Sequence, residues 1–310
     1  MFSIVITTQN RLPLLKRSIE SALNQTVACE VVIVDDYSSD DTEEYVRSLG
    51  SSVVYHRNST KMGQSKTVNT GVKIASGKWI KLLDDDDYLA PNCIEIFTNA
   101  INAHPQAVIC SCQAKNVTSN GEILSKTSTI GSGTATYVQQ EDIHYGMLID
   151  RLPFGTPVQV AFQKESFLKT GGWHSLFNGY GNDIESWIRI AQYGDAIFVN
   201  QCLAYRTIWA GGYSGNFSIK KRLENHILLK QQTLQFVHKK YTNSIPHISE
   251  ISNFLNLYWG LIELRNRKVD GIKILYPSCL LFKSWQTLAK FFYTKKMQGF
   301  KLPICKNLKF

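Results

Sequence analysis

The first third of the chain alternates short apolar runs with segments of helical spacing. Residues 2–8 form a β-branched apolar run that is typical of a fully buried parallel strand. Similar runs follow at residues 30–34, 52–56, 78–83 and 107–112. Helical spacing between the first two runs is shown by Leu15, Ile19, Ala22 and Leu23. Asn10 stands where it could cap this helix, and Pro13 falls within the first turn.

The pattern changes twice further along the chain. From residue 113 to 160 it loosens, and turn pairs such as Asn120-Gly121 predict hairpins and a mobile loop. Order returns with a helix beginning near Lys164, a second helix over about 182–193 and a strand at 196–200. After about residue 217 amphipathic helical stretches dominate, through 240 and again across 248–268.

Strands that alternate with helices predict an α/β fold with a doubly wound, mainly parallel sheet and helices on both faces. We therefore divide the chain into a domain of residues 1–215 and a helical, basic C-terminal extension of residues 216–310. The domain itself has two halves, at about 1–112 and 113–215.

Composition bounds the class of protein. The 310 residues are 44% hydrophobic, which is enough for a sizeable core, and no apolar run reaches the length of a membrane span. The N-terminus enters a strand pattern directly, so we expect no signal peptide. The seven cysteines are odd in number and lack a CxxC pair, which predicts free thiols in a reducing, cytoplasmic compartment.

The net charge of +9 is concentrated at the end of the chain. Residues 261–310 hold eleven Lys or Arg against Glu263 and Asp270. Helical spacing of Leu281, Trp285, Leu288 and Phe292 predicts one apolar helix face. We expect residues 279–310 to bind an anionic membrane surface, as a peripheral contact on the inner face of the cytoplasmic membrane. Packing of this face on the domain is the alternative, and the aromatic content argues against a nucleic-acid partner.

Four consecutive aspartates, residues 84–87, follow the strand at 78–83. Carboxylates this close repel one another, so they need either full solvation or a cation. Thr7, Thr8, Asp35 and Asp36 also stand at strand ends. Ligands of doubly wound sheets bind beyond the carboxyl ends of the strands. The alternatives are a solvated acidic turn, and an aspartate at 35 or 36 that only caps the turn at 38–42.

These motifs together resemble the family 2 inverting glycosyltransferases. The similar segments are residues 3–11, 21–26, 31–42, 63–91, 171–173 and 181–189. The resemblance covers roughly residues 2–210 and implies a GT-A-type fold with Mn²⁺ or Mg²⁺. It implies a nucleoside-diphosphate sugar donor, UDP-linked, and a glycan or lipid-linked glycan acceptor in bacterial surface polysaccharide synthesis. Residues 1–112 then become the nucleotide-sugar half and 113–215 the acceptor half.

The resemblance also implies roles for single residues. Asp86 would bind the metal, with Asp84 facing the ribose or a metal-bound water. Nucleotide contacts would come from Thr7, Thr8, Asn10, Asp35, Asp36, Lys66, Asp84 and Asp85. Asp183 would be the catalytic base, with Glu185 as second candidate, and Trp173 and Trp209 would lie on the acceptor side. Arg189, on another face of that helix, is expected to be an internal ion-pair partner.

Two departures from the family pattern keep other interpretations open. Asn182 stands where the family has Glu, and Ile208-Trp209 where many relatives carry a metal-binding His. The third metal ligand is therefore undetermined, and a non-catalytic sugar-nucleotide-binding protein of the same fold is the alternative. A nucleotidyltransferase would have a Gly-rich loop after the first strand, whereas the first glycine here is Gly50.

Overall fold

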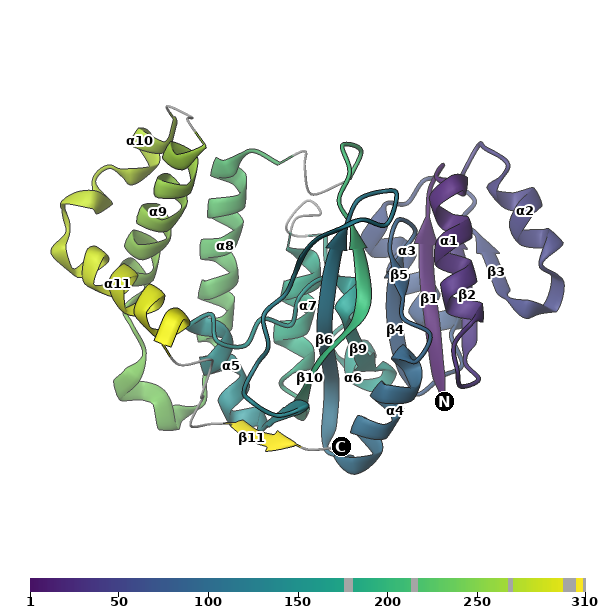
Figure 1. Cartoon of the computed structure of the whole chain (residues 1–310), viewed down its shortest axis with the longest axis horizontal. Helices are drawn as coiled ribbons and strands as arrows, with labels where there is room; N and C mark the ends of the chain where they lie inside the picture. Colours follow the sequence, from purple (N-terminus) through teal and green to yellow (C-terminus); the bar gives the residue numbers. More distant parts are fainter. Residues whose placement is uncertain (176–180, 213–216, 267–269, 298–304, 309–310) are drawn as a thin grey trace.

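The computed structural model of the chain describes residues 1–175, 181–212, 217–266, 270–297 and 305–308 (Figure 1). The strands are β1 (Phe2–Thr8), β2 (Glu30–Asp35), β3 (Val54–Arg57), β4 (Trp79–Asp84), β5 (Tyr88–Leu89), β6 (Ala107–Val117), β7 (Ile123–Lys126), β8 (Ala135–Val138), β9 (Val160–Gln163), β10 (Asp195–Thr207) and β11 (Cys305–Leu308). The helices are α1 (Leu12–Leu23), α2 (Thr42–Ser48), α3 (Gln64–Ile74), α4 (Cys93–Ala103), α5 (Gln140–Leu148), α6 (Lys164–Lys169), α7 (Asn182–Ile190), α8 (Ile219–Leu234), α9 (Ile248–Arg265), α10 (Asp270–Leu275) and α11 (Phe282–Met297). Short 3₁₀ segments lie at Gly50–Ser52, Pro157–Gln159, Lys239–Ser244 and Ser278–Leu280.

The strands form one sheet in the order β11-β8-β10-β6-β9-β4-β1-β2-β3, with β5 paired to β10 and β7 to β6. Strands β3, β2, β1 and β4 are parallel, and so are β6 and β10. The sheet as a whole is mixed, because β9 lies antiparallel between β4 and β6. The predicted α/β class is confirmed, and the parallel half carries the strand ends that the sequence analysis singled out.

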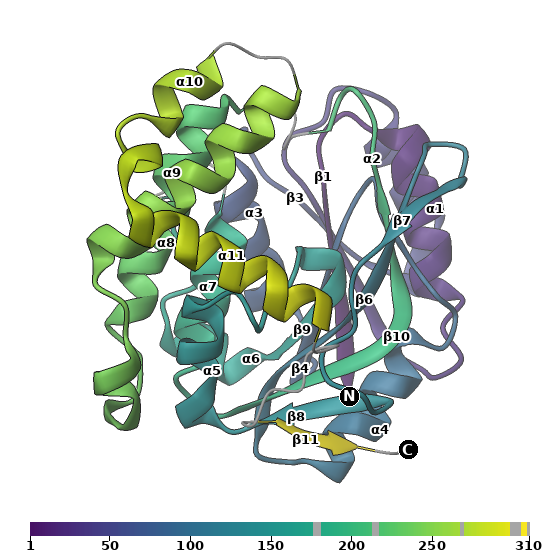
Figure 2. The same cartoon turned by 60° about the vertical axis from the view of Figure 1, so that its left-hand side comes forward.

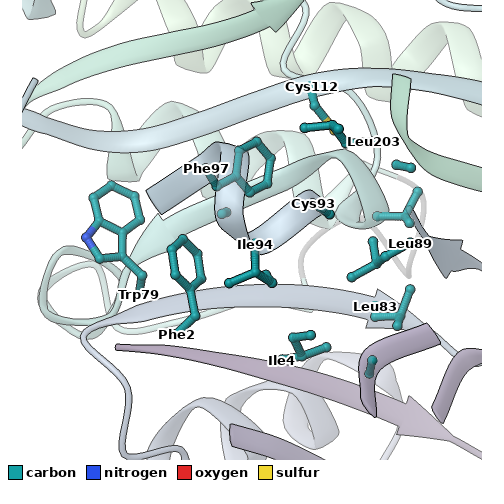
Figure 3. Packing of buried hydrophobic residues seen from close by; sticks show 14 of the residues in the cluster. Phe2, Ile4, Trp79, Leu83, Leu89, Cys93, Ile94, Phe97, Cys112 and Leu203 are labelled. Carbon is teal, nitrogen blue, oxygen red and sulfur yellow. The ribbon is translucent and has the colours of Figure 1, made fainter. Parts of the chain in front are cut away.

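Two hydrophobic layers cover the sheet, one on each face. On one face α1 and α4 pack on β1 and β4, where Phe97 stacks on Phe2 with ring centroids 6.5 Å apart (Figure 3). On the other face α3, α5, α6 and α7 contribute side chains such as Val72, Phe167 and Trp187. Gly71 of α3 allows close approach to the sheet, since a Cβ there would lie 2.4 Å from Cγ1 of Val5. Burial on both faces explains why these strands read as continuous apolar runs.

Three details differ from the sequence predictions. The loose region contains a helix, α5, in addition to the expected hairpin of β6 and β7. Strand β10 extends to Thr207, well beyond the predicted end at residue 200. Asn10 does not cap α1: the N-cap residue is Arg11, and Oδ1 of Asn10 instead accepts a hydrogen bond from the backbone N of Ser39 at 2.7 Å.

The helices of the extension form a layer beside the sheet, and strand β11, near the end of the chain, joins the sheet. A third apolar cluster joins α8, α9, α11 and Leu148 of α5. Strand β11 pairs antiparallel with β8 at the sheet edge (Figure 2). Among the described residues, none of the helices has the length and apolar character that spanning a membrane requires. The six cysteines whose side chains are described are free thiols, as predicted.

Candidate active site

The parallel strands bring the predicted site residues to one edge of the sheet. In the register of β1 and β2, Thr8 lies opposite Asp35, and in that of β1 and β4, Thr7 lies opposite Asp84. Residues 84–87, which we call the acidic turn, begin where β4 ends. The convergence expected from the topology is therefore present in the structure.

Helix α1 holds the backbone of the acidic turn. The Ser18 hydroxyl lies 3.0 Å from the backbone O of Asp85 and also hydrogen bonds to the backbone O of Asp87. Arg17 Nη2 donates to the backbone O of Asp86 and to Oγ1 of Thr207, each at 2.7 Å. The sequence analysis did not select Ser18 or Arg17. The available signal was their place on the helix directly after β1, whose start meets the same sheet edge.

Two of the four aspartates are occupied by partners within the protein. Asp85 accepts hydrogen bonds from Thr8 Oγ1 at 2.9 Å and from Arg11 Nη1 at 3.0 Å. Asp87 accepts one from the backbone N of Thr207 at 2.8 Å. These bonds explain how a run of carboxylates is tolerated after a buried strand. They account for Asp85 and Asp87, but not for Asp84 and Asp86, the two carboxylates that were predicted to face a metal ion.

The acidic turn concentrates unneutralised negative charge. Burial and, after it, the charges of Asp86, Asp85 and Asp183 raise the pKa of Asp84 to about 7, although the Arg11 charge opposes the shift. Burial also raises the pKa of Asp85 to about 6, although the Arg11 charge opposes this shift. Because Asp183 acts on Asp84 through space, the predicted base and the acidic turn face the same region.

Asp86 has two neighbours that the sequence analysis did not pair with it. Trp209 Nε1 donates to Asp86 Oδ2 at 2.9 Å, and Arg11 Nη1 lies 3.6 Å from the same oxygen. The Arg11 guanidinium also lies 5.5 Å from the Trp209 ring centroid, which is cation–π distance. Trp209, expected on the acceptor side, therefore contacts the acidic turn itself.

Helix α7 presents Asp183 and buries Glu185. Gly181, with φ of 99°, is the N-cap residue, and Asp183 follows in the first turn. Burial raises the pKa of Asp183 to about 6, while backbone N–H groups and the charge of Arg206 oppose the shift. Glu185 binds Arg189 through Oε1 at 2.5 Å. Arg189 also donates to the backbone O of Gly172, so its expected role as an internal ion-pair partner is confirmed.

On the nucleotide side, Asp35 is enclosed by the protein. It accepts hydrogen bonds from the backbone N of Ser38 at 2.8 Å and from the Tyr55 hydroxyl at 2.9 Å. Arg57 Nε lies 3.7 Å from its Oδ2. Asp35 is fully buried. Its contact with Ser38 agrees with the alternative interpretation, in which Asp35 only caps the turn at 38–42.

Asp36 shapes the loop that leads into α3. It accepts hydrogen bonds from the side chain of Asn58 at 2.9 Å and from the backbone N of Met62 and Gly63 at 2.7 and 2.8 Å. Burial opposes ionisation of Asp36, but these bonds outweigh it and lower the pKa. Lys66, in the first turn of α3, is exposed.

Trp173 lies in the core. Its side chain is 4% exposed and its ring packs edge-on against Trp187, with centroids 6.3 Å apart. So little exposed ring surface does not favour direct contact with an acceptor, and the predicted place of Trp173 on the acceptor side stays a prediction.

A cavity of about 310 Å³ lies between β6, β10 and the segments near residues 126–130 and 150–155. Its lining includes Gln113, Lys126, Arg151 and Asn200, but most of the surface exposed to the cavity is apolar. Gly155, also in the lining, accepts a hydrogen bond from Trp187 Nε1 at 3.1 Å. Trp187 follows Asp183 by one turn of α7, so the helix that carries Asp183 is hydrogen-bonded to one lining residue of the cavity.

Comparison with known proteins agrees with this geometry. The model of the family described as "Glycosyl transferase family 2" matches residues 3–169. A Campylobacter jejuni protein named GalNAc(5)-diNAcBac-PP-undecaprenol beta-1,3-glucosyltransferase is 24% identical over 98% of this chain and 99% of its own length. Escherichia coli chondroitin synthase is 26% identical over 85% of this chain and 37% of its own length.

Solved structures show the same fold. Residues 1–349 of S. aureus TarS, in complex with UDP-GlcNAc, superpose with a TM-score of 0.62 at 16% identity, covering 88% of this chain and 90% of that one. The mannosyltransferase PcManGT from Pyrobaculum calidifontis, with GDP-Man and Mn²⁺, gives 0.56 at 15% identity, covering 97% and 87%. The predicted GT-A-type fold is confirmed. Since the family model covers more than half of the chain, this protein belongs to glycosyl transferase family 2 and is a glycosyltransferase.

Proposed function

We propose that the chain transfers a sugar from a nucleoside-diphosphate sugar, UDP-linked, to a glycan or lipid-linked glycan acceptor with inversion at the anomeric carbon. The observation that carries the proposal is that the ends of β1, β2 and β4 bring Thr8, Asp35 and the acidic turn to one edge of the sheet. A single displacement needs a base and a leaving-group site on opposite sides of one bound sugar. Asp183 and the acidic turn are suited to these two parts.

The acidic turn suits a hard divalent cation, Mn²⁺ or Mg²⁺. Asp84 and Asp86 are the proposed ligands, since Asp85 and Asp87 bind Thr8, Arg11 and the backbone of Thr207. A cation at Asp86 would replace or share the contacts of its Oδ2 with Trp209 and Arg11. Among the described residues no three His, Cys, Asp or Glu side chains form a metal site by themselves. Mg²⁺ commonly takes one or two carboxylates and completes its shell with water and substrate phosphates. A bound cation would stabilise the negative charge of the leaving diphosphate.

Asp183 is the proposed base, and the contacts of Glu185 favour Asp183 over it. A base must be free to accept the proton of the acceptor hydroxyl. Glu185 is buried and held by Arg189, whereas Asp183 is partly exposed in the first turn of α7. Burial keeps the pKa of Asp183 near 6, which suits a base that works at neutral pH.

The nucleotide is proposed to bind along the ends of β1 and β2. Thr7, Thr8 and Asn10 line the end of β1, and Lys66 is an exposed cation in reach of a phosphate-binding role. Asp35 and Asp36 act on this region through the turn at 38–42 and the loop at 58–63. We propose that they shape the base and ribose pocket.

The acceptor is proposed to be lipid-linked. The name of the Campylobacter jejuni relative specifies an undecaprenol-linked acceptor, and so does that of an Escherichia coli relative, WfaP, which is 36% identical over 90 residues. A chain of this kind would work in the cytoplasm, at the inner face of the cytoplasmic membrane, in surface polysaccharide synthesis. We propose that Trp209 borders the acceptor site from its position beside Asp86.

A non-catalytic sugar-nucleotide-binding protein is the second candidate. Trp209 occupies the region of the acidic turn where many relatives of this pattern supply a His. If the indole blocked metal binding, donor binding would survive without turnover.

The test is a donor screen with the full chain, measuring thermal shift and release of the nucleoside diphosphate with and without Mn²⁺. We expect one donor to be hydrolysed slowly with Mn²⁺, and Asp86→Asn to abolish this release while leaving the fold intact. Asp41→Asn, an exposed aspartate of the neighbouring turn, is the control and should behave as the parent. Binding without any release, with or without acceptor, would instead establish the non-catalytic alternative.

A further inference from the structure

We propose that the outer edge of the helical extension, from Ile272 to Trp285, is a docking surface for an anionic lipid bilayer. This proposal rests on the proposed function, because docking on a bilayer is useful to an enzyme whose acceptor is lipid-linked. The surface itself is defined by the exposure of described residues and by the net charge of residues 261–310, and it does not depend on the chemistry of the active site.

The proposed surface exposes six bulky apolar side chains within fourteen residues of the chain. Their exposed fractions are 58% for Ile272, 67% for Tyr276, 70% for Leu280, 43% for Leu281, 75% for Phe282 and 43% for Trp285. Single exposed apolar residues are ordinary on protein surfaces, whereas a large contiguous apolar patch marks an interaction site. Tyr and Trp in this set are the residues that favour the membrane–water interface.

The surface differs from the helix face that the sequence predicts. Leu288, expected on the membrane side, is 6% exposed and belongs to the core of the extension. Phe292 lies outside the described side chains. Leu288 therefore packs within the protein, which agrees with the alternative interpretation for this residue, while Leu281 and Trp285 are exposed. The apolar surface is shifted toward α10 and the start of α11.

Charge selects an anionic bilayer as the partner. Residues 261–310 carry eleven Lys or Arg and two acidic residues, and the rest of the chain is balanced. Lys273 and Lys283, both exposed, lie within the apolar run, and Lys283 pairs with Glu250 of α9. Basic groups beside interfacial aromatic residues attract anionic headgroups while the apolar side chains enter the boundary region.

The position of this edge fits a membrane-linked substrate. Helices α10 and α11 pack on α9, and α10 lies toward the same end of the molecule as the carboxyl end of β1 (Figure 1, Figure 2). That end carries the acidic turn, since β1 and β4 are parallel. Docking through the α10 part of this edge would turn the end of the molecule that carries the acidic turn toward the headgroups, whereas the start of α11 lies below that end (Figure 1).

The experiment is co-sedimentation of the full chain with vesicles of equal parts phosphatidylglycerol and phosphatidylcholine, and with phosphatidylcholine alone. The variant is Leu280→Ser with Phe282→Ser, which removes the two most exposed apolar side chains of the surface. The matched control is Ile123→Ser with Leu124→Ser on β7, where the exposed fractions are 61% and 56%. Sedimentation velocity without lipid and nucleoside-diphosphate release in solution are measured on each protein.

We expect the parent and the β7 control to bind the anionic vesicles at low salt, with binding weakened at high salt. The Leu280/Phe282 variant should bind about tenfold more weakly, since each apolar side chain lost from the interface reduces the partition. Its nucleoside-diphosphate release should match the parent, which separates this surface from the proposed catalysis. Equal vesicle binding by variant and parent would overturn the proposal. So would a dimer in solution that the variant abolishes, because the surface would then be an interface between copies.

Discussion

At the scale of single residues, the site is a problem of distributing negative charge. Four adjacent carboxylates and Asp183 are brought together, while Arg11 is the cation that pairs directly with the turn. Thr8 and Arg11 stabilise the carboxylate of Asp85, and the backbone N–H of Thr207 stabilises that of Asp87. The remaining carboxylates are held in a state that a cationic ligand would stabilise.

The two acidic residues of α7 should respond differently to the same change. Asp183→Asn should lower kcat by about a hundredfold or more, because the acceptor hydroxyl loses its base, and should leave donor affinity nearly unchanged. Glu185→Gln should retain most of kcat but lower the stability by about 2 kcal/mol, because Arg189 loses a buried charged partner. Steady-state kinetics and chemical denaturation separate these effects. A folded but inactive Glu185→Gln beside an active Asp183→Asn would assign the base to Glu185.

The raised pKa of Asp84 makes a prediction about pH and stability. Its folded pKa of about 7 lies above the ordinary value of an unfolded aspartate, about 3.9. Between these values the folded chain keeps a proton that the unfolded chain has lost, so stability falls as pH rises through this window. We expect the Tm of the parent, relative to Asp84→Asn, to fall between about pH 4 and pH 7.

Mn²⁺ provides the corresponding control for that measurement. A cation that binds the ionised carboxylate should raise the Tm of the parent more at the higher pH, and Asp84→Asn should lose this dependence. A difference in Tm between parent and variant that stays constant with pH would mean that Asp84 is not the titrating group.

At the scale of elements, the strands and helices that have a clear hydrophobic period were predicted from the sequence, whereas those that depend on tertiary contacts were not. The strand ends at Thr8, Asp35 and Asp84 were placed correctly, because buried parallel strands form unbroken apolar runs. Helix α5 was missed because Asp142 and His144 are buried beside Ile143, so no polar face marks its period.

The contacts around the acidic turn were also beyond sequence reasoning. Arg11 and Ser18 follow β1 closely in the chain, but nothing local shows that they reach the segment after β4. Trp209 and Asp86 are separated by 123 positions. The types of residue needed for the chemistry could thus be predicted, whereas the pairs they form required the fold.

Lys81 of β4, which is fully buried, is a second residue whose contacts could not be predicted from the sequence. Its Nζ donates to the backbone O of Leu82 at 2.9 Å and of Pro157 at 3.2 Å, and also to that of Val158. Burial lowers the pKa of Lys81 despite nearby acidic groups. The strand that delivers the acidic turn is thereby tied to the segment that borders the cavity of the acceptor half.

At the scale of the whole molecule, the extension is anchored to the catalytic part by buried polar contacts. Lys230 of α8, 4% exposed, donates to the backbone O of Met147 and Leu148 and to Oδ1 of Asp150. Burial would raise the pKa of Asp150, but Lys230 and His226 outweigh it and lower the pKa. The boundary near residue 215 stays a prediction, and across it the two parts share packed surfaces.

This anchoring predicts that the extension and the catalytic part unfold together. Lys230→Met should lower the stability by about 2 kcal/mol, because two buried carbonyl groups and a partly exposed carboxylate lose their donor. The transition should remain single, with the same midpoint by tryptophan fluorescence and by circular dichroism. Lys239→Met, at an exposed position just beyond α8, is the control and should leave the midpoint unchanged. An unchanged midpoint for Lys230→Met, or separate transitions in the parent, would show that the extension is an independent unit that needs no contact with α5.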